Sequence, residues 1–199
     1  MERPTFPVTI GTQQVDLPIV RLSDDVGIAL LISVDLGVSF CERAGAELAE
    51  RIGDLGVDVV ASVATMGIPI AIEVTRHLGL DQYVVFHKTP KIHLDDAISE
   101  PVRSITTATA QRLLFDRERI GVVQGRRVAV IDDVVSTGAS AAAALRLLRG
   151  VGAVPVAVGA IVTEGEAWRD ALGADAGLVH ALGALPLFEP LADGTFVAV

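Results

Sequence analysis

The sequence predicts an α/β fold built on a mostly parallel sheet that helices cover on both faces. Short apolar runs rich in Val and Ile recur along the 199 residues without alternation of polar side chains, and helical patterns separate them. Strands buried on both faces have this continuous apolar character, and helical crossovers are typical of parallel sheets. The length is close to that of one domain of ~150 residues. We therefore expect a single domain over residues 1–199.

The expected strands are the apolar runs themselves. In chain order they cover residues 27–34, 57–63, 83–86, 127–131 and 153–162, all short and poor in charge. Their length and their Val and Ile content favour strands over buried helices.

The expected helices lie between these runs. Residues 39–52 repeat small and apolar side chains on one helical stripe, residues 69–78 end before Gly79, and residues 138–148 are rich in Ala. A glycine just past an apolar-periodic segment is a common helix end.

Two regions interrupt this alternation. Residues 87–125 form a long polar excursion, and the alternating Ser and Thr of residues 103–109 predict a flexible β-hairpin. Long excursions from compact domains are often functional lids. The remaining interruption is at the chain ends: we expect residues 1–25 and 164–199 to form a small hood over a core of residues 26–163.

Charge and composition exclude several classes of protein. The net charge of −9 disfavours nucleic-acid partners. The longest uncharged stretch, residues 150–163, is shorter than the ~20 residues of a membrane-spanning helix. No signal-peptide pattern opens the chain. A single cysteine, Cys41, excludes an intrachain disulfide and a multi-cysteine zinc site. We expect a cytoplasmic protein with no membrane partner.

The strongest chemical signal lies in residues 128–140. An apolar run ends in Asp132 and Asp133, and a Ser-Thr-Gly turn then leads into a helix. Turn amides and a helix N-terminus bind anions, and a glycine lets the backbone approach a phosphate closely. The carboxylates can accept hydrogen bonds from the vicinal hydroxyls of a sugar. The order of residues predicts a sugar-phosphate site, although acidic and hydroxyl caps also occur at ordinary helix starts.

Two further segments point to anion binding. Residues 64–67 form a second turn between a strand and a helix, whose free amides could cradle a diphosphate. Residues 87–91 place Lys88 and Lys91 just after a strand in an otherwise acidic chain. Each pattern is also compatible with a plain turn and with a solvated pair of lysines.

Residues 128–140 resemble the phosphoribosyl pyrophosphate (PRPP) loop of type I phosphoribosyltransferases, and element order extends the resemblance over about residues 44–163. The family has a Rossmann-like sheet, a hood and a hairpin lid. The turn at residues 64–67 resembles the adenine and xanthine phosphoribosyltransferase branch and the purine operon repressors. The resemblance implies that Asp132 and Asp133 hold the ribose hydroxyls. It assigns the 5′-phosphate to a single loop made of Val135, Ser136, Thr137, Gly138, Ala139 and Ser140.

The resemblance also implies sites for the diphosphate and the base. The residues that match the diphosphate positions are Ala64, Thr65, Met66, Gly67, His87, Lys88 and Lys91. Met66 departs from the adenine enzymes, which usually carry Arg before this glycine. Ser104 and Thr106 of the lid are further candidates for diphosphate contact. Asp116 is the candidate catalytic carboxylate, with Glu118 as its alternative, and Glu164 and Trp168 are candidates for reading the base.

We therefore expect an Mg²⁺-dependent transfer of the phosphoribosyl group from PRPP to a purine-like base. No direct protein ligand to Mg²⁺ is expected, because PRPP and water would hold the ion near Asp132 and Asp133. A homodimer is implied, since the lysine cluster often serves the neighbouring subunit's site in this family. Two alternatives stay open: a non-catalytic regulator that binds PRPP, and a transferase for a non-purine acceptor.

Overall fold

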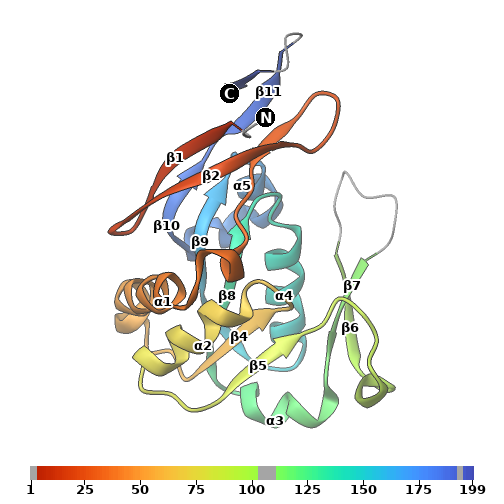
Figure 1. The fold of residues 1–199 in the computed structure, drawn as a ribbon. Coiled ribbons are helices and arrows are strands. Elements are labelled where there is room, and N and C mark those ends of the chain that lie inside the picture. The colour runs from red at the N-terminus through yellow and green to blue at the C-terminus, as the bar shows by residue number, and fades with distance from the viewer. Residues whose placement is uncertain (1–3, 103–110, 192–194) are drawn as a thin grey trace.

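A five-stranded parallel sheet forms the centre of the molecule (Figure 1). The computed structural model describes residues 4–102, 111–191 and 195–199. In spatial order the sheet contains β10 (Val179–Leu185), β9 (Val154–Glu164), β8 (Arg127–Val135), β4 (Val59–Val63) and β5 (Tyr83–Phe86). All neighbouring pairs run parallel, which confirms the predicted α/β class.

Helices cover both faces of this sheet, and each face has its own apolar core. On one face α1 (Val38–Ile52) and α2 (Ile68–His77) pack over buried residues such as Val60 and Ile131. On the other face α4 (Ala139–Gly150) and the short α5 (Ala167–Leu172) cover residues such as Val130 and Val158. The remaining helical pieces are η1 (Ser33–Leu36), η2 (Gly53–Leu55), η3 (Ile92–Leu94), η4 (Arg117–Arg119), α3 (Ile120–Val123) and η5 (Gly173–Leu178).

A second sheet forms the hood at one end of the core (Figure 1). Its order is β1 (Thr5–Ile10), β2 (Gln13–Arg21), β3 (Gly27–Ala29), β11 (Leu187–Pro190) and β12 (Phe196–Ala198). Both chain ends therefore contribute to it, as expected. The turn between β1 and β2 is anchored to the core, because the amide of Gly11 donates to the carbonyl of Leu182 at 3.0 Å.

Two expected boundaries are wrong. The strand expected over residues 27–34 ends at Ala29, and the chain then turns inward as η1. The segment 164–199 is not all hood, because β10 pairs in parallel with β9 and extends the core sheet. No long helical pattern precedes residues 178–185 in the sequence. The connection from β9 to this strand consists only of the short α5 and the 3-10 turn η5.

The polar excursion contains the expected antiparallel hairpin, formed by β6 (Ile98–Val102) and β7 (Gln111–Phe115). Its base is part of the core: Leu113 and Phe115 are buried, and the ring of Phe115 packs edge-on against Phe86 at a centroid distance of 5.1 Å. Residues 103–109, which carry the Ser and Thr alternation, lie outside the described residues. Among the described residues, no helix is long and apolar enough to span a membrane.

Candidate functional site: two loops at the carboxyl edge of the sheet

The two loops singled out in the sequence follow adjacent strands of the core sheet. Residues 136–138 follow β8, and residues 64–67 follow β4, which pairs with β8. Because parallel strands end at the same edge, the two loops lie side by side there. In open α/β sheets this carboxyl edge is where ligands bind.

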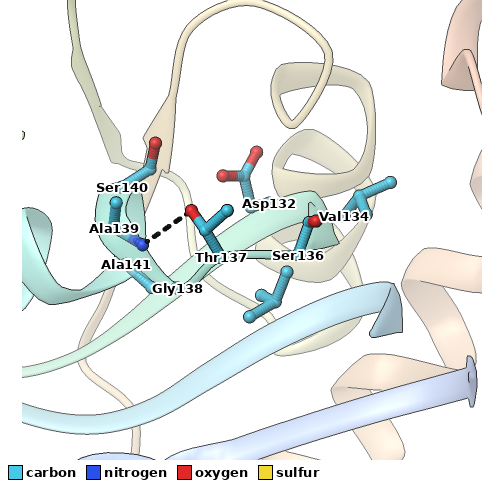
Figure 2. Close-up of a pocket in the computed structure, with 9 residues that line it drawn as sticks. Asp132, Val134, Ser136, Thr137, Gly138, Ala139, Ser140 and Ala141 are labelled. Atoms are coloured by element: carbon cyan, nitrogen blue, oxygen red, sulfur yellow. Dashed lines mark hydrogen bonds between the residues drawn. The ribbon is translucent and has the colours of Figure 1, made fainter. Parts of the chain in front are cut away.

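The loop after β8 lines a pocket of about 130 Å³ (Figure 2). The residues around it are Asp132, Val134, Val135, Ser136, Thr137, Gly138, Ala139, Ser140 and Ala141. Every residue assigned to the 5′-phosphate is therefore part of one pocket wall, together with Asp132. Asp133, the second acid, is the next residue of the same strand, β8.

The backbone of this loop is open to an anion. Gly138 has φ of +74° and precedes the first turn of α4. Among the described residues, no hydrogen-bond acceptor is found for the amides of Thr137, Gly138 or Ser140. Unpaired amides at the start of a twelve-residue helix form an anion site. The geometry fits a phosphate group.

Burial and mutual repulsion disfavour a negative charge on Asp132 of the acid pair. Burial raises the pKa of Asp132 well above its ordinary value, the negative charge of Asp133 raises it further, and nearby Lys88 opposes the shift. The amide of Asp133 donates to Oδ1 of Asp132 at 3.0 Å. Such a pair gains from donors or cations that share its charge, and vicinal hydroxyls or a divalent ion would supply them.

The loop after β4 is packed tightly against the acid pair. A β-carbon on Gly67 would lie 2.9 Å from Oδ1 of Asp132 and 2.8 Å from Oγ of Ser62. The peptide bond between Ala64 and Thr65 is cis. Among the described residues, the amides of Thr65, Met66 and Gly67 have no acceptor. Consecutive free amides form a nest that suits a diphosphate.

Two residues of this site are missed by the sequence analysis. Ser33 is fully buried, and its hydroxyl donates to the carbonyl of Met66 at 2.6 Å. Ser62 is fully buried, and its hydroxyl has no hydrogen-bond partner among the described residues. Each is a single serine inside an apolar segment. Such a serine belongs to no motif that would mark it as part of a site.

Lys88 of the basic cluster lies near Asp132. Lys88 is close enough to Asp132 to lower that group's pKa, and Lys88 and Lys91 are both exposed. His87 is half-buried and joins the lid to the core, because its backbone exchanges hydrogen bonds with Leu114 at 2.8 and 2.9 Å. Lys88 is thus available to an anion bound beside Asp132.

The candidate catalytic carboxylates are placed elsewhere. Asp116 caps η4, and its carboxylate accepts a hydrogen bond from the amide of Glu118 at 3.0 Å. Neither Asp116 nor Glu118 lines the pocket. The structure does not bring them to the acid pair, so their catalytic role stays a prediction. Ser104 and Thr106 lie outside the described residues.

The two candidates for base contact support the phosphate loop from behind. Burial raises the pKa of Glu164, and a hydrogen bond from the Ser136 hydroxyl opposes the shift. Trp168 is 4% exposed, donates to the carbonyl of Gly165 and carries the Arg169 guanidinium 4.2 Å above its ring. Because its ring is covered, Trp168 is not placed to stack on a base in this conformation.

The part of the chain that the structure describes offers no site at which protein side chains alone would hold a metal ion. Among the residues that the structure describes, no group of three or more His, Cys, Asp or Glu side chains could hold a metal ion. Cys41 is buried, and desolvation, with the charge of Glu73, raises its pKa. A buried thiol of raised pKa is inert as a nucleophile.

Comparison with known proteins agrees with this geometry. Residues 41–175 match the phosphoribosyl transferase domain family, and the chain belongs to that family. It has the type I fold, and the relatives that it resembles include a xanthine phosphoribosyltransferase.

The individual similarities are moderate. The chain is 28% identical over 131 residues to xanthine phosphoribosyltransferase from Laribacter hongkongensis, covering 65% of this chain and 68% of that protein. It is 35% identical over 105 residues to the transcriptional regulator GfcR from Methanococcoides burtonii, covering 53% of this chain but 44% of the regulator. Adenine phosphoribosyltransferase from Rhodothermus marinus superposes with a TM-score of 0.67 over 91% of this chain and 94% of that chain, at 20% identity.

Proposed function

We propose that the protein transfers the 5-phosphoribosyl group from PRPP to a nitrogen of a purine-like base, with release of diphosphate. The observation that carries the proposal is the close approach of Gly67, in the loop after β4, to Asp132, which lines the pocket formed by the loop after β8. One loop offers a phosphate site, the other a diphosphate site, and the acids lie between them. PRPP carries these groups on a single ribose.

The protein's contribution is positioning and electrostatic stabilisation. Asp132 and Asp133 orient the ribose through its hydroxyls. The bond between the anomeric carbon and the diphosphate oxygen breaks, and the electron pair leaves with the diphosphate. The base nitrogen forms the new bond and gives up its proton to the solvent. Open amides at Thr65–Gly67 and the charges of Lys88 and Lys91 stabilise the leaving group. The lid excludes water that would otherwise hydrolyse the activated ribose.

A magnesium ion fits this site as a companion of the substrate. Asp132 and Asp133 place two carboxylates side by side, and burial with mutual repulsion raises the pKa of Asp132. Mg²⁺ keeps several waters and binds through one or two carboxylates and substrate phosphates. Bound there, it would neutralise charge on the leaving diphosphate. Asp132 and Asp133 would hold it through its water shell and the ribose hydroxyls.

The acceptor is proposed to be a purine-like base. The xanthine phosphoribosyltransferase relative and a hypoxanthine/guanine phosphoribosyltransferase from Methanosarcina mazei, 25% identical over 118 residues, support this class. Met66 stands where adenine enzymes usually carry Arg, which counts against adenine as the acceptor. We also propose a cytoplasmic homodimer.

The test measures diphosphate release from Mg·PRPP with adenine, guanine, hypoxanthine, xanthine, uracil and orotate as acceptors. Release that depends on one base and yields its nucleotide supports the proposal. The similarity to a transcriptional regulator favours one other candidate, a PRPP sensor without catalysis. PRPP binding without release in the presence of any base would support the sensor and contradict the transferase.

A further inference from the structure

Ser33 contacts the loop after β4 from the side of the core. It is the first residue of η1, it is fully buried, and its hydroxyl donates to the carbonyl oxygen of Met66 at 2.6 Å. Its own carbonyl accepts a contact from Sγ of Cys41 at 3.4 Å. A link therefore runs from α1 through Ser33 to the loop after β4.

This hydrogen bond sets the direction of a peptide group in the loop. The peptide bond between Met66 and Gly67 is trans. In a planar trans peptide the C=O and the N–H point in opposite directions. Because the Met66 carbonyl points to Ser33, the amide of Gly67 points away from it, where it has no acceptor among the described residues.

Packing leaves this peptide group little freedom on the other side. Gly67 lies against Ser62 and Asp132, with the Cα of Asp132 3.0 Å from the position of an added β-carbon. The Met66 carbonyl is part-buried, and a carbonyl partly withdrawn from water is destabilised when it has no donor. Without the Ser33 hydroxyl the Met66 carbonyl is no longer held toward η1. The peptide group would then tilt within the space that Ser62 and Asp132 leave, and the Gly67 amide would point in a different direction.

We infer that Ser33 is a positioning residue for the diphosphate, because it fixes the Met66–Gly67 peptide so that the Gly67 amide is presented to the leaving group. The inference rests on the proposed function, since it needs the loop to bind diphosphate. It assigns no contact between Ser33 and substrate. Its effect is specific: the diphosphate subsite depends on Ser33, whereas the 5′-phosphate loop after β8 does not.

The test compares Ser33→Ala with a matched loss of a buried hydroxyl. Thr75 is 3% exposed and donates to the carbonyl of Ala71 at 2.6 Å, within α2 and away from both loops. Calorimetric titrations of wild type, Ser33→Ala and Thr75→Val would use Mg·diphosphate and ribose 5-phosphate as separate probes. For Ser33→Ala we expect about tenfold weaker diphosphate binding, the loss of roughly one hydrogen bond. Ribose 5-phosphate affinity should be unchanged, and Thr75→Val should bind both probes like wild type.

The outcomes separate the inference from the proposed function. Unchanged diphosphate affinity in Ser33→Ala, or an equal loss for both probes, would overturn the inference. Wild-type protein that binds neither probe would overturn the proposed function instead. If Ser33→Ala does not fold, Ser33→Cys keeps a similar shape with a weaker donor. It should then lose diphosphate affinity alone, and retention of full affinity would contradict the role of the hydroxyl.

Discussion

Gly67 lies so close to Asp132 that a β-carbon on Gly67 would stand 2.9 Å from Oδ1 and 3.0 Å from Cα of Asp132. Gly67 belongs to the loop after β4, and Asp132 belongs to β8 and lines the pocket of the loop after β8. This close approach brings the two anion-binding loops together at one acid. Any side chain at Gly67 must push the acid pair or the loop out of place.

Gly67→Ala is therefore expected to weaken binding of PRPP by about tenfold or more, because overpacking costs ~1–3 kcal/mol where backbone atoms block the new methyl. Calorimetry with Mg·PRPP measures the loss. Gly121→Ala is the control, since its added β-carbon meets no atom within 4 Å. Wild-type affinity in Gly67→Ala would show that the loops are not held together by this contact.

Gly138 is expected to be needed for its conformation and for its packing. Its φ is +74°, and an added β-carbon would lie 3.0 Å from backbone atoms of Trp168. Gly125 has φ of +72° with nothing within 4 Å. Gly125→Ala should cost only the ~1–2 kcal/mol of left-handed backbone. Gly138→Ala should cost more in thermal unfolding and should also lose affinity for ribose 5-phosphate.

Equal stability losses in the two glycine variants, with ribose 5-phosphate affinity retained in Gly138→Ala, would contradict this interpretation. The phosphate loop would then tolerate displacement of α5.

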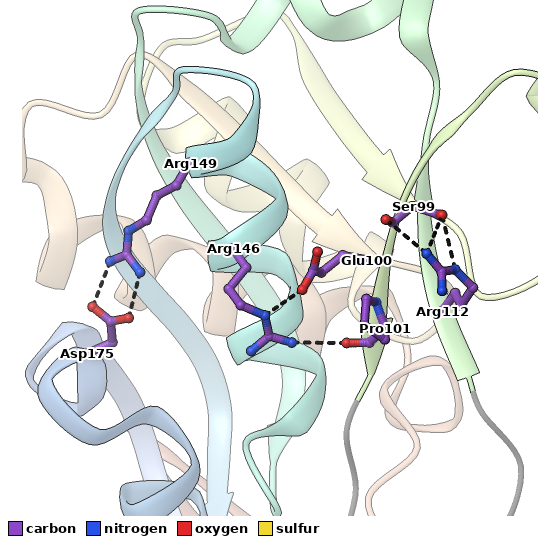
Figure 3. A network of polar contacts seen from close by, with 7 residues as sticks. All are labelled: Ser99, Glu100, Pro101, Arg112, Arg146, Arg149 and Asp175. Carbon is purple, nitrogen blue, oxygen red and sulfur yellow. Dashed lines mark hydrogen bonds and ion pairs between the residues drawn. The ribbon is translucent and has the colours of Figure 1, made fainter.

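Arg146 ties the lid hairpin to α4 (Figure 3). Its guanidinium contacts Oε1 of Glu100 at 2.6 Å and the carbonyl of Pro101 at 3.0 Å. Arg146→Met should speed amide exchange in β6, while the free energy of unfolding falls by less than ~1 kcal/mol, because the pair is partly exposed.

Arg149→Met is the matched control for the hairpin. Arg149 lies on the same helix and pairs with Asp175 through two hydrogen bonds of 2.7 Å, away from the lid (Figure 3). The Arg149→Met variant should leave the amide exchange rates in β6 unchanged. Equal exchange rates in the two variants would mean that apolar packing alone holds the hairpin.

The pH dependence of stability should report on Glu164. Burial raises the pKa of this carboxyl, and the hydrogen bond from Ser136 only partly opposes it. A group whose pKa is raised by folding destabilises the fold as pH rises from its ordinary value of 4.5 through the folded value. Glu164→Gln should therefore be more stable than wild type at neutral pH, and the difference should vanish well below pH 4.5.

Chemical denaturation across this pH range measures the effect. The exposed neighbour Glu166, whose side chain is 76% accessible, gives the control variant Glu166→Gln. If Glu164→Gln were less stable than wild type at neutral pH, the hydrogen bond from Ser136 would outweigh desolvation.

Elements of the fold that depend on local sequence patterns can be predicted from the sequence. The run 127–131 and its acid pair locate β8, and the Ser-Thr-Gly turn locates the start of α4, because apolar continuity and turn chemistry are local signals. The sequence alone assigns β10 to the hood because this strand follows no long helix, and its place in the core sheet depends on pairing with β9, a non-local contact.

The same distinction holds for the site. The loops and lysines can be predicted from motifs. The hydrogen bond from Ser33 to Met66, by contrast, joins residues that are 33 positions apart in the chain. Trp168 is a candidate for base contact because aromatic residues bind bases, yet its burial against Gly138 and beneath Arg169 arises only in the folded chain.

The central claim is that the two loops and the acid pair form one PRPP site. The most direct measurement is calorimetric titration of Mg·PRPP into wild-type protein and into the double variant Asp132→Asn with Asp133→Asn. The account predicts saturable binding at one site per chain in wild type, and loss of both binding and turnover in the double variant. Absence of binding in wild type, or equal affinity in the double variant, would contradict it.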